Sequence, residues 1–312
     1  MKVFVLTGPT GVGKSEVGVA LAKNYDLDII SADSRQIYRY FDIGTDKPRP
    51  EERKQVRFHL IDFVEPSDNY SAADFARDAR KIIANLIEQQ RRFIIVGGAN
   101  FYLHALFKPL FNVPRVNYEL RSRLMTKSSA ELYNQLKQLD PVRAAQLHPN
   151  DRQRIIRALE IYELTGKTFT EHTKEQTEGS DLQPFYVVLT MPRMLLYERI
   201  NQRFDRMMAE GLLAEVQNLY RRGVGLNTPA AQGYGYRELF LYLEGKLGLI
   251  SAVDLAKKRT REYAKRQLTW LHSLSAVNWV EVNSTIEAVG KIESLLLSVY
   301  NLTSEQKLKK GV

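Results

Sequence analysis

The chain has 312 residues, of which 44% are hydrophobic and 26% charged, so it can bury a large core and is not a disordered chain. It contains no cysteine, which excludes disulfides, cysteine-ligated zinc, iron–sulfur clusters and thiol nucleophiles, and which fits a reducing compartment. The sequence has no apolar run of about eighteen residues and no leader pattern, so we expect a soluble, cytoplasmic protein without a membrane segment.

The net charge of +9 is unevenly distributed. Residues 1–100 carry a net charge of +1, whereas residues 101–312 carry +8. This asymmetry favours a small-ligand site in the first part of the chain and a surface for a polyanion in the rest. A solvated basic surface without a partner explains the charge equally well.

Short apolar runs alternate with helical periodicity in the first hundred residues. Strands are expected at residues 2–7, 28–31 and 93–96, with a further candidate at 59–62. Helices are expected at residues 15–23 and 71–90, and the second begins with a capping-box pattern at Ser71 and Asp74. Strands alternating with helices predict an α/β fold with a parallel sheet.

The pattern changes after Pro109. The next segment has helical periodicity at residues 118–125, 130–139 and 153–164 and no clear strand, and apolar runs return at residues 185–190 and 277–282. We therefore expect a sheet core that is interrupted by a helical insertion and followed by a helical C-terminal part. The expected divisions are a first core segment (1–111), the insertion (112–182), a second core segment (183–302) and a polar, disordered tail (303–312).

A phosphate-binding loop follows the first expected strand. Its residues fit the pattern G-x-x-x-x-G-K-[ST] and are Gly8, Pro9, Thr10, Gly11, Val12, Gly13, Lys14 and Ser15. The glycines let backbone N–H groups surround phosphate oxygens, the lysine adds a positive charge, and Ser15 can bind Mg²⁺. The motif predicts a P-loop NTPase-like core that binds a phosphorylated ligand, and it does not say which ligand.

Two further features point to the same site. Asp33 follows the second expected strand, and ligands of parallel sheets bind at the carboxyl ends of strands, so Asp33 should face the phosphates as a general base or a metal partner. A cap for the following turn is the alternative role. Arg199 and Arg203 lie four residues apart on one expected helix face and could hold a diphosphate.

The basic rear part of the chain contains three candidate RNA-binding segments. Arg154 and Arg157 share a helix face, and Lys257, Arg261 and Lys265 repeat every four residues along another helix. The glycine–tyrosine loop at residues 232–237 could stack on unpaired bases. Exposed basic helices and a tight turn with two packing tyrosines are the alternatives.

The ordered set of motifs resembles the tRNA dimethylallyltransferase (tRNA isopentenyltransferase) family over nearly the whole chain. The motifs are GPTGVGKS, IISADSRQIYR, DIGTDKP, HLIDFVEPSDNYSAADF, VGGANFYL, HPNDRQRIIRALEIYELTGK, RINQRFDRMMAEGLLAEV, GYGYRE and AKRQLTWL. The resemblance implies transfer of a dimethylallyl group from dimethylallyl diphosphate, with Mg²⁺, to N6 of the adenosine immediately 3′ of the anticodon. The product would be N6-isopentenyladenosine.

The resemblance also implies residue roles. Asp33 would accept the N6 proton, Lys14 and Arg203 would stabilise the leaving diphosphate, and Ser15 would bind Mg²⁺. The helical insertion would bind the anticodon stem-loop, and we expect a monomer. Contacts to tRNA would come from Asp33, Ser34, Arg35, Gln36, Ala99, Arg121, Gln153, Arg154, Ile155, Ile156, Arg157, Gln232, Gly233, Tyr234, Gly235, Tyr236, Arg237, Lys265, Arg266, Gln267 and Trp270.

Four positions depart from the family pattern. Ala99 replaces a threonine, Arg35 replaces an apolar methionine, and Gln232 and His272 stand where basic residues are usual. Two other functions remain open from the residues alone. A small-molecule kinase would use the same loop and arginines but leaves the basic helix unexplained, and a nucleotide-regulated RNA-binding module leaves Asp33 without a role.

Overall fold

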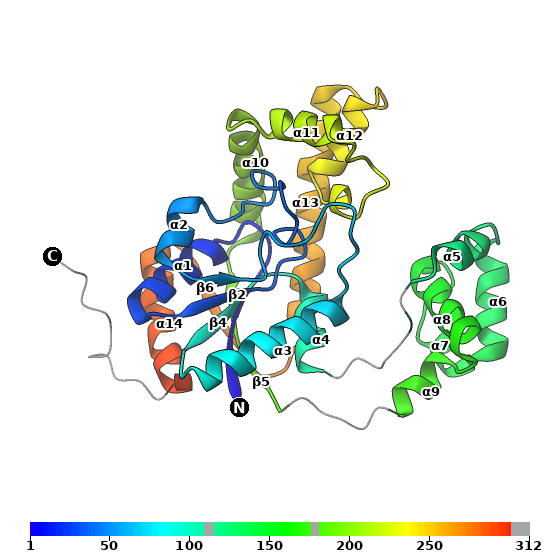
Figure 1. Cartoon of the computed structure of the whole chain (residues 1–312), viewed down its shortest axis with the longest axis horizontal. Helices are drawn as coiled ribbons and strands as arrows, with labels where there is room; N and C mark the ends of the chain where they lie inside the picture. The colour runs from blue at the N-terminus through cyan, green and yellow to red at the C-terminus, as the bar shows by residue number, and fades with distance from the viewer. Residues whose placement is uncertain (109–113, 115, 176–180, 301–312) are drawn as a thin grey trace. The chain divides into compact units, whose positions relative to one another are not determined.

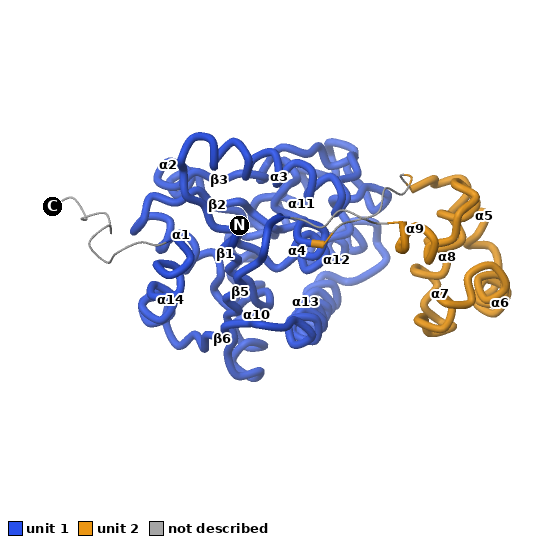
Figure 2. The backbone as a smooth tube through the Cα atoms, turned by 90° about the horizontal axis from the view of Figure 1, so that it is seen from below, with its two compact units in different colours: residues 1–107, 181–312 blue, residues 108–180 orange. Residues whose placement is uncertain are grey.

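The computed structural model describes residues 1–108, 114, 116–175 and 181–300. The chain divides into two compact units, drawn in different colours in Figure 2. Unit 1 comprises Met1–Phe107 and Asp181–Val312, and unit 2 comprises Lys108–Ser180. The expected disordered tail at 303–312 lies outside the described residues.

Unit 1 contains both strands and helices. Its strands are β1 (Lys2–Thr7), β2 (Asp28–Ser31), β3 (Phe58–His59), β4 (Phe93–Val96), β5 (Gln183–Thr190) and β6 (Val277–Glu281). Its helices are α1 (Lys14–Tyr25), α2 (Pro50–Gln55), α3 (Ala72–Glu88), α4 (Asn100–Phe107), α10 (Arg193–Ala209), α11 (Leu212–Arg221), the 3-10 turn η1 (Ala230–Gln232), α12 (Tyr236–Leu243), α13 (Leu249–Leu271) and α14 (Thr285–Tyr300).

The described strands form one parallel sheet in the order β3-β2-β4-β1-β5-β6. Figure 1 labels four of them, β2, β4, β5 and β6. The expected parallel α/β fold is therefore confirmed. Strand β1 pairs with β4 on one side and with β5 on the other, from Lys2 opposite Gln183 to Thr7 opposite Val188. The segment that comes after unit 2 in the chain thus completes the same sheet as the segment before it.

The strands form because their apolar runs are buried on both faces, as parallel sheets require. Along β1, Phe4 and Leu6 join a core shared with α1 and α14, whereas Val3 and Val5 join a core shared with α3 and α4. Both cores lie in unit 1, one on each face of the sheet. The capping box at the start of α3 is also present, since the Ser71 hydroxyl accepts the Asp74 N–H at 3.1 Å.

A third core in unit 1 joins the C-terminal half of α10 to α11, α12 and the loop that follows β2. Ile37 and Phe41 from that loop pack with Phe204, Met207 and Tyr236. This core holds the loop of residues 32–48 over the carboxyl ends of the strands, where ligands of parallel sheets bind.

The expected strand at residues 59–62 is wrong in extent. Strand β3 covers Phe58–His59 only, because Leu60 and Asp62 adopt left-handed backbone conformations with φ of 60° and 59°. The Asp62 carboxylate turns to the Lys47 ammonium at 2.8 Å and to the Arg53 guanidinium at 3.1 Å. These ion pairs hold the pKa of Asp62 below its usual range despite partial burial.

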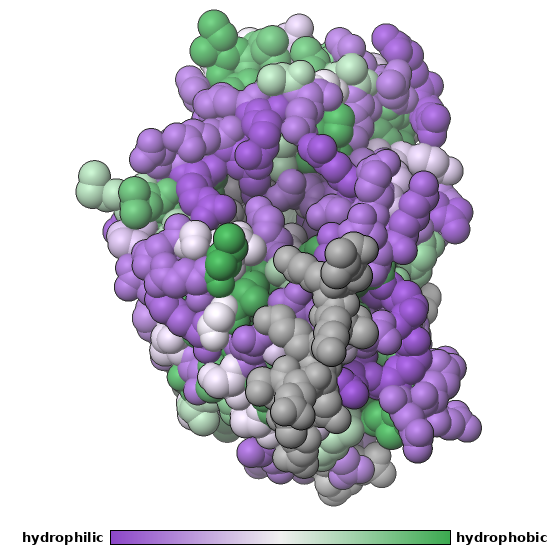
Figure 3. All heavy atoms as spheres, turned by 90° about the vertical axis from the view of Figure 1, so that its left-hand side faces the viewer, coloured by the Kyte–Doolittle hydropathy of each residue, from purple (hydrophilic) through white to green (hydrophobic). Residues whose placement is uncertain are grey.

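Among the described residues, no helix combines the length and apolar character that crossing a membrane requires. The face drawn in Figure 3 is mainly hydrophilic, and its apolar side chains occur in small patches.

The described residues of unit 2 form helices joined by turns, without a strand. Its helices are α5 (Tyr118–Met125), α6 (Ser129–Leu139), α7 (Pro141–Ala145), α8 (Arg152–Thr165) and α9 (Phe169–Lys174). Its core is formed by Leu124, Leu132, Leu136, Ile155 and Leu159. Ile155 and Leu159 lie four residues apart on α8, so the expected apolar face of this helix is confirmed.

A buried carboxylate organises the start of unit 2. Glu160, which has no solvent exposure, accepts the Asn117 N–H at 2.7 Å and the Arg157 guanidinium at 2.7 Å. The Arg121 guanidinium lies 3.4 Å from the same carboxylate, and Arg157 also donates to the Pro114 carbonyl at 2.7 Å. Glu160 therefore joins the N-terminus of α5 to α8 and holds both arginines in place.

We predict that Glu160→Ala lowers the free energy of unfolding of unit 2 by about 3 kcal/mol, because it leaves two half-buried arginines without their anion. The matched control is Glu163→Ala, on the exposed side of the same helix, where the Arg123 ion pair is worth about 0.2–1 kcal/mol. Urea denaturation of the full chain, followed by amide hydrogen exchange in α5 and α8, measures both. Equal losses in the two variants would contradict the prediction.

Candidate active site

The phosphate loop connects the carboxyl end of β1 to the N-terminus of α1, as the motif predicts. Gly11 and Gly13 adopt left-handed conformations with φ of 84° and 101°, which side chains disfavour. A Cβ on Gly11 would lie 2.8 Å from Ile200 Cγ1 on α10, so the close approach of that helix also requires glycine. Strand β1 and α10 thus hold the loop from both sides.

The backbone N–H groups of the loop have different partners. The Thr10 N–H donates to the Gln267 amide oxygen at 2.8 Å, and the Val12 N–H donates to the Pro9 carbonyl at 3.4 Å. The first-turn N–H groups of α1, including those of Lys14 and Ser15, have no intrahelical acceptor. These helix-terminal groups, together with the helix dipole, form the part of the loop suited to an anion.

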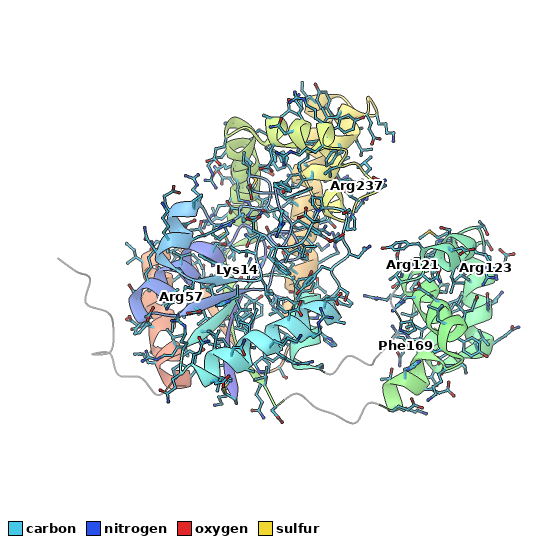
Figure 4. The ribbon with its side chains drawn as sticks, viewed as in Figure 1. Lys14, Arg57, Arg121, Arg123, Phe169 and Arg237 are labelled. Carbon is cyan, nitrogen blue, oxygen red and sulfur yellow. The ribbon has the colours of Figure 1, made fainter. Side chains whose placement is uncertain are left out.

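Lys14 is half-buried and is the first residue of α1 (Figure 4). Its ammonium donates to the Pro9 carbonyl at 2.9 Å. Desolvation is the main cause that lowers its pKa to about 8; the charge of Asp33 opposes this shift, and the nearby Arg203 guanidinium adds to it. An anion placed beside Lys14 would replace the lost solvation of the ammonium and would raise its pKa.

Asp33 lies just beyond β2 and has two functions available. One carboxylate oxygen, Oδ1, accepts the backbone N–H groups of Arg35 at 2.7 Å and Gln36 at 3.2 Å, so Asp33 does cap its turn. The same side chain lines the cavity that contains the phosphate loop, and its charge acts on Lys14. The cap orients the carboxylate, so the structural role and a role in catalysis are compatible.

One cavity of about 380 Å³ in unit 1 brings these groups together. Five basic and three acidic side chains line it, so its charge favours an anionic ligand. These charged residues are Lys14, Arg35, Arg199, Arg203 and Arg206, with Glu16, Asp33 and Asp46. Apolar side chains also line it, among them Ile29, Phe58, Val96, Ile200, Phe204 and Met207.

Helix α10 supplies both charged and apolar parts of the cavity wall. Arg203 donates to the Thr10 hydroxyl at 2.9 Å and lies 3.5 Å from the Asp46 carboxylate. Arg199 lies against Gly13 of the phosphate loop. The expected arginine pair therefore lies at the loop, and the apolar residues one position further along the helix line the same cavity.

Asp46 and Tyr263 are among the cavity residues that the sequence patterns did not identify. Asp46 lies within the motif DIGTDKP, but no spacing rule linked it to Arg203, because the contact joins a loop to a helix more than 150 residues away. Tyr263 precedes Gln267 by four residues on α13, and this helical spacing could have placed both on one face. Burial raises the pKa of the Tyr263 hydroxyl, and the charge of Asp33 raises it further.

The glycine–tyrosine loop presents one of its tyrosines and buries the other. Tyr234 is 38% exposed, and the Arg266 guanidinium donates to its hydroxyl at 2.8 Å. Tyr236 is buried, donates to Glu215 and accepts the Gly44 N–H at 3.0 Å, so it is a packing residue. Arg237 is exposed at the start of α12 (Figure 4).

The residues expected to contact RNA differ in exposure. Those exposed are Gln153, Arg154, Gln232, Tyr234, Arg237, Lys265 and Arg266. Those half-buried are Asp33, Ser34, Arg35, Arg121, Arg157 and Trp270. Those buried are Gln36, Ala99, Ile155, Ile156, Gly233, Gly235, Tyr236 and Gln267. The side chains of Ile155 and Ile156 are buried in the core of unit 2, and that of Tyr236 is buried in the core that joins α11 to α12.

Part of the expected basic stripe on α13 forms contacts within the protein. Lys257 forms an ion pair with Asp205 at 2.5 Å, and Arg261 donates to the Asn201 amide oxygen at 2.6 Å, both on α10. Lys265 is exposed. The exposed cations of this helix are Lys258 near its middle and Lys265 and Arg266 toward its C-terminus.

The oxygen ligands that line the cavity fit an Mg²⁺ ion that binds together with a diphosphate. Among the described residues, no group of three or more histidine, aspartate or glutamate side chains is placed to hold a metal ion. Ser15 and Asp33 nevertheless bring oxygen ligands to the cavity. Mg²⁺ commonly binds through one or two protein oxygens, several waters and substrate phosphates, so this sparse set is sufficient only when phosphate oxygens are added.

We predict that inorganic pyrophosphate binds about tenfold more weakly at pH 9 than at pH 7, because Lys14 with a pKa of about 8 loses its charge over that interval. Isothermal titration calorimetry measures the change. Lys14→Arg is the control, since arginine keeps its charge and the pyrophosphate titration is common to both proteins. The same pH dependence in both proteins would contradict the prediction.

Comparison with known proteins identifies relatives along nearly the whole chain. A family model described as IPP transferase matches residues 36–274. A tRNA dimethylallyltransferase from Alkaliphilus oremlandii is 42% identical over 300 residues, covering 95% of this chain and 96% of the relative. A tRNA dimethylallyltransferase from Anoxybacillus flavithermus is 43% identical over 296 residues, covering 95% of each chain.

Solved structures agree with the sequence relatives. The tRNA isopentenylpyrophosphate transferase of Bacillus halodurans superposes with a TM-score of 0.71 at 36% identity, covering 95% of this chain and 96% of that one. A eukaryotic dimethylallyltransferase acting on tRNA gives a TM-score of 0.80 at 27% identity, covering 99% of this chain and 81% of that one. With the motif order, the cavity and these matches in agreement, the chain belongs to the IPP transferase family, that of the tRNA dimethylallyltransferases.

Proposed function

We propose that this chain is a prenyltransferase that moves a dimethylallyl group from dimethylallyl diphosphate to N6 of the adenosine immediately 3′ of the anticodon in tRNA. The products are N6-isopentenyladenosine in the tRNA and free diphosphate. One observation carries the proposal on the side of the structure: the desolvated Lys14, the Arg203–Thr10 contact and the Asp33 carboxylate all line one cavity. The relatives support the acceptor and the donor.

The main barrier lies on the donor side. The lone pair of an adenine N6 is delocalised into the ring, so it is a weak nucleophile, whereas an allylic carbon tolerates developing positive charge. Breaking the C1–O bond therefore requires that the departing diphosphate be stabilised. Lys14, Arg203 and the first N–H groups of α1 supply fixed positive charge and hydrogen-bond donors for it.

Asp33 suits the role of proton acceptor. As the bond between N6 and C1 forms, N6 must lose one proton, and the Asp33 carboxylate takes it while diphosphate leaves with the bonding electrons. General-base catalysis of this kind contributes roughly 10²–10⁴-fold to the rate. The backbone N–H groups of Arg35 and Gln36 orient the carboxylate through Oδ1 and leave the other oxygen for the proton.

Magnesium belongs to the proposal as a companion of the diphosphate. Ser15 would hold it, and it would neutralise charge on the leaving group. Localisation in the cytoplasm and a monomeric state also remain proposals, carried by the absence of cysteine and of any evident oligomerisation pattern.

The RNA-facing residues are proposed from exposure and charge. In unit 1 they are Tyr234, Arg237, Lys265 and Arg266, and in unit 2 they are Gln153 and Arg154. Unit 2 is proposed to bind the anticodon stem-loop. The acceptor adenine must leave the base stack to reach the cavity, which costs a few kcal/mol that these contacts must offset.

The two other functions account for fewer features. A small-molecule kinase would share the phosphate loop, but it does not explain why Lys265, Arg266 and Tyr234 lie exposed together. An RNA-binding module would not need a capped carboxylate beside a desolvated lysine. The relatives at 40% identity and above also favour the transferase.

The proposal predicts that purified protein, Mg²⁺ and labelled dimethylallyl diphosphate transfer label to unmodified tRNA, at the adenosine beside the anticodon. Digestion of the RNA and chromatography of its nucleosides measure the product. Asp33→Asn should keep the turn, since an amide oxygen still accepts both N–H groups, but should lower the rate roughly 10²–10⁴-fold because the base is lost.

Binding of tRNA by Asp33→Asn should be nearly unchanged, and filter binding measures it. Lost tRNA binding with normal turnover at saturating tRNA would refute the assignment of Asp33 as the base. No label on tRNA with the wild-type protein, in the presence of ATP-dependent phosphorylation of a small molecule, would replace the proposed function by the kinase.

We further predict that Lys265→Ala weakens tRNA binding and reduces the dependence of log affinity on log salt concentration by about one unit, because one phosphate contact is lost. Lys257→Ala is the matched control on the same helix, since its ammonium is paired with Asp205. Affinity measured from 50 mM to 300 mM salt, roughly the range in which counterion release is resolved, compares the two. An unchanged slope for Lys265→Ala would remove this part of α13 from the RNA surface.

A further inference from the structure

Gln267 is a buried amide at the junction of three segments that are distant in the sequence. Its side chain is on α13 and only 2% of the residue is exposed, although sequence analysis expected it at the RNA surface. Burying an amide is unfavourable unless its hydrogen bonds are satisfied. Both ends of Gln267 are satisfied, and each by a loop at the carboxyl edge of the sheet.

The oxygen end of the amide acts on the phosphate loop. Gln267 Oε1 accepts the Thr10 N–H at 2.8 Å, which turns that N–H away from any phosphate. The Thr10 hydroxyl accepts from Arg203 at 2.9 Å, so the residue is held by α13 through its backbone and by α10 through its side chain. The donors left for an anion are then those at the start of α1.

The nitrogen end acts on the loop after β4. Gln267 Nε2 donates to the Gly98 carbonyl at 2.8 Å, and a Cβ on Gly98 would lie 2.5 Å from that nitrogen. The same position lies 3.4 Å from the Lys14 ammonium and 3.2 Å from the Gly8 carbonyl. The absence of a side chain at residue 98 is therefore what lets Gln267 and Lys14 approach the loops at the ends of β1 and β4.

We propose that Gln267 is a positioning residue that sets the shape of the diphosphate-binding loop from helix α13. It acts through Thr10 and Gly98 and does not itself contact RNA. The proposal rests on the proposed function, because it takes the anion bound by this loop to be the diphosphate of the donor. It also links the donor loop to the helix that carries the RNA-facing Lys265 and Arg266, which lie one or two residues from Gln267.

Gln267→Met tests the proposal, because methionine matches the length of glutamine and removes both hydrogen bonds. We expect the Kd for inorganic pyrophosphate with Mg²⁺ and the KM for dimethylallyl diphosphate each to rise about fivefold to twentyfold, as the loss of one or two buried hydrogen bonds implies. The KM for tRNA should stay within twofold. Gln217→Met, a half-buried glutamine on α11, is the control for the substitution itself and should change none of these values.

Amide hydrogen exchange reports the structural cause directly. The Thr10 N–H should exchange faster in Gln267→Met than in the wild type. In Gln267→Glu it should stay protected, because a carboxylate oxygen still accepts that N–H. If the methionine variant does not fold, this second variant still separates the two bonds, because its carboxylate accepts the Thr10 N–H but does not donate to the Gly98 carbonyl, so the Kd for pyrophosphate should rise while Thr10 stays protected.

Two outcomes would overturn the inference. A higher KM for tRNA with an unchanged Kd for pyrophosphate would make Gln267 an RNA contact, as the sequence first indicated. Unchanged protection of Thr10 in Gln267→Met would show that the loop does not depend on this side chain. Because pyrophosphate binding and exchange need no turnover, failure of the proposed transferase activity would leave both measurements interpretable.

Discussion

The desolvated ammonium of Lys14 is the constraint on which the site depends. Burial lowers its pKa to about 8, so the free protein holds a positive charge in a place where water solvates it poorly. Poor solvation raises the free energy of the unbound protein. An anion that binds beside the ammonium relieves this penalty, and the relief adds to the binding free energy of the anion. The neighbouring positive charge of Arg203 destabilises the Lys14 ammonium further, whereas the negative charge of Asp33 partly stabilises it. The Asp33 oxygen Oδ1 is bonded to backbone N–H groups of its own turn.

The other elements of unit 1 position the groups that surround this ammonium. The parallel sheet brings the ends of β1, β2 and β4 to one edge, so the phosphate loop, Asp33 and Gly98 become neighbours. Helix α10 covers the loop with Ile200 against Gly11 and with Arg203 on Thr10. Helix α13 ties the same loops together through the buried amide of Gln267. These contacts connect the loops of the proposed diphosphate site to α10 and α13.

The charged and apolar side chains of α10 suit a donor that has both characters. Arg199, Arg203 and Arg206 line the cavity together with Ile200, Phe204 and Met207, each arginine next in sequence to an apolar residue. A diphosphate ester of a short hydrocarbon has an anionic end and an apolar end. One helix can therefore meet both without a separate pocket, and this agrees with the family to which the chain belongs.

The sequence alone determined the local elements and the chemistry of single motifs. The phosphate loop, the strands of the sheet core except β3, the capping of α3 and the place of Asp33 at a strand end follow from patterns within a few residues, because local sterics and hydrophobic periodicity decide them. The tertiary structure decided which polar side chains are free. Burial of Gln267 and Tyr236, pairing of Lys257 with Asp205 and the contact of Arg203 with Asp46 join residues far apart in the chain. Such contacts depend on how helices pack, and helical spacing gives the face of a residue but not the neighbour that covers it.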